Sequence, residues 1–139
     1  MKAHSLKEFN MSAENLNRIG IVSSIDYEKG MVSVTYPDRD NSTTKLFPYL
    51  CPSGDYSMPK VGDSVMVVHL SNNSASGVVL GTFWDFENKP LNPGKAVHRK
   101  QLSSEAYIEC VDDEITFHDK NGTVTLKDII TALGGLNGD

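Results

Sequence analysis

The chain has 139 residues, of which 39% are hydrophobic and 22% are charged. These proportions lie close to globular averages and exclude a wholly disordered, collagen-like or membrane-embedded chain, while the length allows one ordinary core and a small appendage. The net charge of −5 is opposite to that of a general nucleic-acid binder, which gains most non-specific affinity by neutralising phosphates. We therefore expect no nucleic-acid partner.

Residues 1–17 are predicted to form an N-terminal arm that becomes ordered only against a partner. The arm mixes Leu6, Phe9 and Met11 with polar residues and lacks the continuous apolar stretch of a secretory signal. No window of the chain approaches the ~20 apolar residues that span a bilayer. These features favour synthesis in the cytoplasm, where Cys51 and Cys110 are expected to remain free thiols packed as small hydrophobic side chains.

The segment 18–86 is predicted to fold as one all-β domain, and it opens with a hairpin. From Ile19 onward apolar residues recur at every second position, which is the period of a strand with one buried face. Residues 27–30 between the two strands have the composition of a turn. We expect one face of the first strand to carry Ile19, Ile21, Ser23 and Ile25. The second strand is expected to contain Val32, Val34 and Tyr36.

Three further strands are predicted in this segment. Residues 43–50 should form an edge strand or an irregular crossing, because Pro48 cannot donate to a ladder. Residues 64–70 are mostly apolar and are predicted to be a central strand buried on both faces. After a loop at 71–77, residues 78–84 form the last strand. Five short strands at this spacing are typical of a small closed barrel.

The remaining residues are predicted to form a small β-extension. Residues 87–100 contain two prolines and few apolar residues, so they are expected to be a linker. Residues 101–130 hold three short alternating segments, too short to enclose a core alone. Residues 131–139 are rich in glycine and are expected to be a flexible tail. The side chains expected to face inward in the extension are Ala106, Ile108, Ile115, Phe117, Val124 and Leu126.

No pattern in the sequence indicates catalysis, a nucleotide or a resident cofactor. The histidines at 4, 69, 98 and 118 are isolated, and no pair of them has the spacing of a metal site within one chain. His69 lies in the apolar run 64–70, where a satisfied or rim-facing imidazole is expected rather than a metal ligand. The acidic run 112–114 is expected to be a solvated turn, and residues 119–122 to be a hairpin turn, since they lack the glycine and distal glutamate of a calcium loop.

The order and spacing of several blocks in residues 18–86 resemble those of a known family. Residues 18–22, 30–37 and 46–50 provide the first blocks. The block Pro59-Lys60-Val61-Gly62-Asp63 fits the family pattern of proline, any residue, a hydrophobic residue, glycine and aspartate before a strand. The closing strand fits through Gly77 and Gly81. This combination resembles the oligonucleotide/oligosaccharide-binding (OB) fold of the phage baseplate assembly protein V and VgrG family, with Gly20, Pro59, Gly62, Asp63, Gly77 and Gly81 as fold residues.

The resemblance implies a non-enzymatic structural subunit of the central spike, or baseplate hub, of a phage tail or phage-like contractile injection particle. It implies a homotrimer made in the bacterial cytoplasm, in which the C-terminal extension forms a short β-prism. The implied partners are baseplate hub and tail tube proteins, a separate tip protein and the target envelope. On a threefold axis, one histidine per chain would place three imidazoles around a point, so His98 or His118 is a candidate metal ligand there.

Two departures from the family pattern limit this comparison. The chain lacks the lysozyme domain of some members and the His-x-His apex motif of some tips, and its C-terminal region is too short for a long β-helical needle. Two other functions stay open. One is an OB-fold binding module for nucleic acid or carbohydrate, which would need a basic or aromatic groove. The other is a hydrolase of the cell wall, which would need paired carboxylates on an identifiable scaffold.

Overall fold

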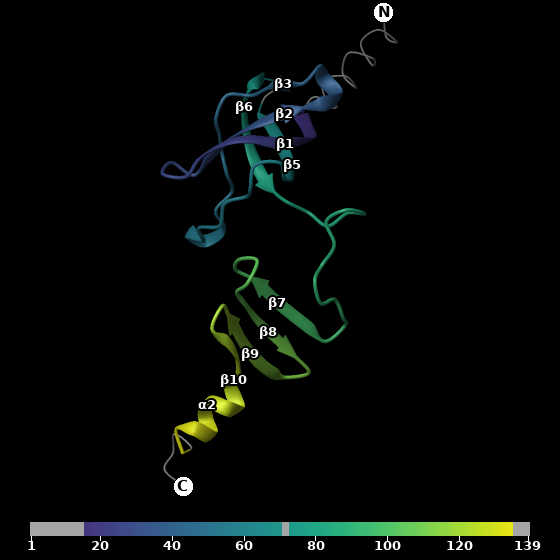
Figure 1. Cartoon of the computed structure of the whole chain (residues 1–139). Helices are drawn as coiled ribbons and strands as arrows, with labels where there is room; N and C mark the ends of the chain where they lie inside the picture. The colour runs from purple at the N-terminus through teal and green to yellow at the C-terminus, as the bar shows by residue number, and fades with distance from the viewer. Residues whose placement is uncertain (1–15, 71–72, 135–139) are drawn as a thin grey trace, which may run out of the picture. The chain divides into compact units, whose positions relative to one another are not determined.

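The computed structural model describes residues 16–70 and 73–134, which divide into two units between Asn88 and Lys89 (Figure 1). Each unit is built around its own antiparallel sheet. None of the helices in these residues has the length and apolar character needed to traverse a lipid bilayer. The architecture is therefore mostly β, as the alternating pattern of the sequence predicts.

Unit 1 is a small barrel. Its ladder runs β3, β2, β1, β5, β6, and β4 pairs with the other part of β2. A parallel bridge between Tyr49, just after β4, and Val79 of β6 joins the two ends of this ladder. The hairpin and the strand at residues 64–70 are confirmed, and the crossing at 43–50 carries two very short strands. The strands are β1 Asn17–Asp26, β2 Met31–Tyr36, β3 Ser42–Thr43, β4 Phe47–Pro48, β5 Ser64–Leu70 and β6 Asn73–Gly81.

The barrel interior is an apolar core to which β1, β2, β4, β5 and β6 all contribute. Along β5, Val65, Val67 and His69 are buried, whereas Met66 and Val68 between them are only half-buried. The prediction that this strand is buried on both faces is therefore wrong, because no second layer covers its outer side in the described residues. The buried hydrophobic residues are Val22, Val32, Val34, Tyr36, Phe47, Val65, Val67 and Val79.

A β-bulge in β1 also corrects the predicted faces of the hairpin. The register to β2 shifts between Val22 and Ser24, so one extra residue lies on β1 at that point. Before the shift, Ile19 and Ile21 point outward, with 54% and 37% of their surface exposed. After it, Ile25 packs against the core. These isoleucines therefore do not share one face, because strict alternation breaks at the bulge.

The residues that resemble the family pattern occupy sterically tight or turning points of the barrel. A Cβ on Gly20 would come within 2.8 Å of the Tyr36 ring and closer still to Val34. Gly62 has φ 97°, a value that favours glycine. Asp63 accepts a 2.9 Å hydrogen bond from the Lys60 backbone and so closes the turn before β5. Pro59 and Gly77 are buried, and Gly81 ends β6.

A polar pair lies inside the core. The Tyr36 hydroxyl and His69 Nε2 are 2.7 Å apart, and both residues are 2% exposed. The Phe47 ring meets the imidazole edge-on at 5.5 Å, and the Arg18 guanidinium lies 5.1 Å from the Tyr36 ring centre. Burial raises the pKa of Tyr36 to about 12, although the charge of Arg18 opposes that shift. His69 is therefore a buried imidazole with a hydrogen-bond partner at Nε2, and it does not face the rim.

Unit 1 ends in a hydrogen-bonded turn rather than in loose chain. Asp85 Oδ1 accepts hydrogen bonds from the backbone N–H groups of Glu87 and Asn88, at 2.8 and 2.7 Å. These bonds lower the pKa of Asp85. The Asn88 side chain in turn donates to the Phe83 carbonyl at 2.8 Å. These hydrogen bonds therefore fold residues 83–88 into a local turn after β6.

Unit 2 is a four-stranded meander followed by a short helix. The sheet order is β10, β9, β8, β7, and every neighbouring pair is antiparallel. β7 begins at Val97, inside the segment predicted as linker, and it was missed because its sequence Val-His-Arg-Lys-Gln has no apolar alternation. Likewise β6 begins at Asn73, inside a predicted loop. The elements are β7 Val97–Gln101, β8 Tyr107–Val111, β9 Glu114–Asp119, β10 Gly122–Thr125 and α2 Leu126–Ala132.

The turns of unit 2 follow from their residues. Asp112 and Asp113 both have positive φ, at 48° and 70°, which is the conformation of a two-residue hairpin loop between β8 and β9. The expectation of turns at 112–114 and 119–122 is therefore confirmed. A reciprocal capping box between Thr125 and Asp128 begins α2 directly after β10.

Candidate interaction surface

Unit 2 has a sheet but no buried core of its own. Among residues 89–134, the part of this unit that the structure describes, no residue is buried. The barrel, by contrast, buries eight hydrophobic side chains. A four-stranded sheet needs a hydrophobic face packed against something to be stable by itself. The described part of unit 2 therefore has a sheet without a buried apolar core in one chain.

Register places five apolar residues of unit 2 on one side of its sheet, whereas Val97 and Val111 lie opposite one another on the other side. Ile108 on β8 lies opposite Phe117 on β9, which lies opposite Val124 on β10. In the next row Cys110 lies opposite Ile115. Directly opposed residues in antiparallel strands share a face. We call this side, defined by Ile108, Cys110, Ile115, Phe117 and Val124, the apolar face.

The apolar face is open to solvent in the single chain. Ile108 is 40% exposed and Phe117 is 37% exposed. The helix adds a second exposed stripe, since Leu126, Ile130 and Leu133 follow the spacing of one helical side. Such a concentration of half-exposed apolar residues is typical of surfaces that bind another protein chain.

Four of the six residues predicted to face inward meet on the apolar face. These are Ile108, Ile115, Phe117 and Val124. Ala106 lies instead in the β7–β8 turn, where its carbonyl accepts from the backbone of Leu102, and Leu126 begins α2. Cys110 alternates with Ile108 in the sequence but was not among the residues predicted to face inward. Both cysteines are free, but Cys51 is exposed, so it is not packed in the interior as predicted.

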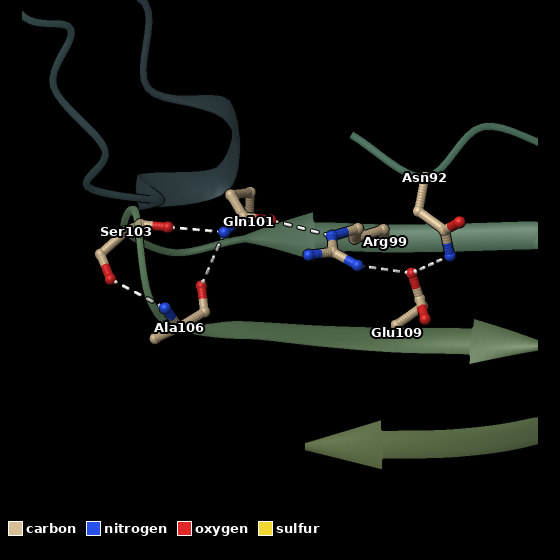
Figure 2. A network of polar contacts seen from close by, with 6 residues as sticks. All are labelled: Asn92, Arg99, Gln101, Ser103, Ala106 and Glu109. Carbon is tan, nitrogen blue, oxygen red and sulfur yellow. Dashed lines mark hydrogen bonds and ion pairs between the residues drawn. The ribbon is translucent and has the colours of Figure 1, made fainter. Parts of the chain in front are cut away.

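The opposite side of the sheet, which we call the polar face, is held by a charged network (Figure 2). Arg99 on β7 and Glu109 on β8 form an ion pair of 2.7 Å, with side chains only 19% and 11% exposed. Asn92, in the segment before β7, donates to the same carboxylate at 2.8 Å. The hydrogen bonds from Asn92 and Arg99 lower the pKa of Glu109. The network therefore fastens the incoming chain to the polar face.

The network continues into the β7–β8 turn and across the sheet. Arg99 donates to Gln101, which donates to the carbonyl of Ser103 at 2.6 Å (Figure 2). The Arg99 guanidinium also lies 3.5 Å from the centre of the Tyr107 ring. On the other flank of that ring, His118 stacks at 4.8 Å between ring centres. The polar face is thus satisfied by its own side chains.

The two histidines proposed as metal ligands lie on opposite faces of the sheet. His98 pairs with Cys110 and so shares the apolar face, whereas His118 pairs with Tyr107 on the polar face. His118 Nδ1 is already bonded to the Thr123 hydroxyl at 2.6 Å. One axis cannot therefore receive both side chains. Within the described residues, no group of three or more His, Cys, Asp or Glu could hold a metal ion in one chain.

Comparison with known protein families identifies a match for the barrel segment of the chain. A family model described as the Type VI secretion system/phage-baseplate injector OB domain matches residues 18–84, which include nearly all of β1 to β6. A comparison with curated proteins finds no match. The family is a structural baseplate domain, so the match supports a structural role related to the baseplate. Residues 18–84 are thus an OB domain of the phage baseplate assembly protein V/VgrG type.

Proposed function

We propose that the chain is a homotrimeric subunit of the central spike of a phage tail or phage-like contractile injection particle. It caps the tail tube, contacts baseplate hub and tube proteins, and is driven with its tip against the target envelope on contraction. The observation that carries this proposal is the apolar face of unit 2, which has no cover within the described part of one chain. The function is mechanical, and no catalytic step is assigned.

Threefold packing suits a sheet of four strands. Strands about 4.8 Å apart give each sheet a width of about 19 Å. In a triangular prism with sides of that width, the axis lies about 5.5 Å from each sheet, which is close to half the ~10 Å separation of packed sheets. Apolar side chains from three copies therefore meet at the axis without leaving a channel. A fourfold ring of the same sheets would leave the centre unfilled.

The polar face supports the same orientation. Its charged and hydrogen-bonding groups are already paired within the chain, and Asn92 lies against it. Burying these groups against another copy would add a desolvation cost without a new apolar contact. The apolar face has the opposite property. We therefore orient the apolar face toward the axis and the polar face toward water, which places His98 rather than His118 on the inner side of the prism.

Absolute mass in solution tests the proposal. Light scattering coupled to size exclusion on the full chain is expected to give about 46 kDa, three times the 15.2 kDa of one chain. A mass near 15.2 kDa at high concentration would contradict the trimer. A mass of twice that value would instead indicate two sheets packed face to face, and would also contradict it.

A matched pair of variants ties the mass to the apolar face. Phe117→Glu places a charge on this face, and we expect it to yield mainly monomer, because burying an unpaired charge is costly. Phe117 is 37% exposed in one chain and lies in unit 2, outside the barrel, so the barrel should still fold. Thr123→Glu adds the same charge on the polar face, opposite His118, and should remain trimeric. Equal behaviour of the two variants would remove the apolar face as the interface.

A further inference from the structure

We propose that the sheets of unit 2 also join edge to edge in the trimer, with β7 of one copy pairing with β10 of the next. This inference rests on the proposed trimer and specifies how it closes. In the described residues the sheet ends at β7 on one side and at β10 on the other. Unpaired strand edges invite uncontrolled association unless they are paired or protected. A closed ring of three copies pairs both edges of every sheet.

Strand direction fits such a junction. All neighbouring strands in unit 2 are antiparallel, and the sheet contains an even number of strands from β7 to β10. The two edge strands therefore run in opposite directions within one copy. Rotation about an axis along the strands preserves those directions, so β7 meets the next copy's β10 as an antiparallel pair. No strand has to reverse or swap between copies.

Side-chain alternation limits the register of this junction. The apolar face must continue from one copy to the next, so His98 and Lys100 on β7 must lie opposite apolar-face positions of β10, which are Gly122 and Val124. The register that uses all of the shorter strand β10 places His98 opposite the partner's Val124. It then places Lys100 opposite the partner's Gly122.

This register also brings Lys100 near an acidic residue of the neighbouring copy. In each copy Gly122 lies opposite Asp119 on β9. Gly122 has no side chain, so no side chain would stand between Lys100 and the partner's Asp119. Their Cα atoms would be about 9.6 Å apart, the spacing of two strand intervals, which the two side chains can bridge. Lys100 would therefore pair with the partner's Asp119 at each corner of the prism, away from the axis.

A charge exchange tests the junction in the full-length chain. Lys100→Asp and Asp119→Lys each place like charges together, and we expect each to weaken trimer association by about fivefold per junction, or roughly a hundredfold over three junctions. The double variant, with both exchanges, should recover most of that loss. Lys120→Asp, at an exposed turn position next to Asp119, serves as the control and should change association little.

The outcomes separate the two proposals. If the unmodified chain is a monomer, the proposed function fails, and this inference fails with it. If the chain is a trimer but the single exchanges have no effect, or the double variant does not recover, the edge junction is wrong and the proposed function stands. The measurement is the dissociation constant of the trimer, obtained by analytical ultracentrifugation over a dilution series.

Cysteine cross-linking provides an independent readout of the register. His98→Cys with Val124→Cys should form disulfides between copies on mild oxidation and give a covalent trimer on a denaturing gel. Cys110 lies opposite His98 in the same chain, so the background carries Cys110→Val as well as Cys51→Ser. The control, Lys100→Cys with Val124→Cys, is two residues out of register. Cross-linking of the control as strong as that of the test pair would overturn the assigned register.

Discussion

The Tyr36–His69 pair shows what a single buried contact does in this small barrel. The hydroxyl of Tyr36 and Nε2 of His69 are 2.7 Å apart between strands that are far apart in sequence. The sequence predicts a satisfied or rim-facing imidazole at position 69, because the residue lies in an apolar strand. It does not predict the partner, since that depends on how β1, β2 and β5 close around the core.

Tyr36 should make the unfolding free energy of the barrel depend on alkaline pH. Its pKa rises from 10.0 to about 12 on folding, so the phenol ionises first in the unfolded chain. The stabilisation is fully present below pH 10 and declines as pH rises toward 12. Tyr36→Phe should cost about 1 kcal/mol at neutral pH by removing the hydrogen bond to His69, and should lack that alkaline decline.

Urea unfolding of both proteins at about pH 8 and about pH 11 checks this prediction. The difference in unfolding free energy between the original chain and Tyr36→Phe should shrink at the higher pH. Comparing the two proteins cancels the titration of the lysines, which they share. Parallel loss of stability in both would show that Tyr36 does not carry the effect.

At the scale of elements, strands with strong apolar alternation were predictable and the others were not. The hairpin of β1 and β2 and the strand β5 follow from their period. β7 could not be found in that way, because Arg99 and Gln101 lie on its polar face and His98 and Lys100 lie on its other face. The bulge at Val22–Ser24 inserts one residue without any glycine or proline to mark it.

The contact that closes the barrel was equally impossible to predict from the sequence pattern. Its last contact is the single bridge between Tyr49 and Val79, made by a segment that Pro48 interrupts. The general expectation of a closed barrel came from the number and spacing of strands. The particular contact depends on tertiary packing, which a period in the sequence does not report.

Glu109 should control how firmly β7 is held to the sheet. Its pKa is lowered by hydrogen bonds from Asn92 and Arg99, so the interaction is present above the usual carboxyl pKa. It is lost as pH falls through the lowered value. Glu109→Gln removes the charge at all pH values, and we expect faster amide hydrogen exchange across β7 and at Asn92.

Glu105→Gln is the matched control, since Glu105 is an exposed residue in the β7–β8 turn. It should leave exchange in β7 unchanged. Acidification of the original chain should reproduce the effect of Glu109→Gln, whereas the variant itself should show little further change. Unchanged exchange in Glu109→Gln would mean that backbone pairing alone holds β7.

At the scale of the whole molecule, the two units obtain their stability differently. The barrel buries a core within one chain, whereas the described part of unit 2 buries no residue. The sequence indicated this contrast, because the segments after residue 100 are too short to enclose a core. It could not assign faces, since these depend on the register that pairs Ile108 with Phe117 and Val124.

Thermal unfolding should therefore show one transition that depends on protein concentration and one that does not. Association stabilises unit 2 by mass action, so its transition should shift to higher temperature as concentration rises. The barrel transition should stay in place. Differential scanning calorimetry at two concentrations about a hundredfold apart measures both. A single transition at the same temperature in both scans would contradict this division of stability.

The hydrogen bonds at the two ends of the connecting segment have a mechanical consequence. Asn88 is bonded within the turn that follows β6 and Asn92 is bonded to the sheet of unit 2, which leaves only Lys89, Pro90 and Leu91 between the two bonded residues. Four residue steps span at most about 14 Å, and the ring of Pro90 restricts rotation there. In the proposed trimeric spike, a load applied to one unit would reach the other through this short segment, once in each of the three copies.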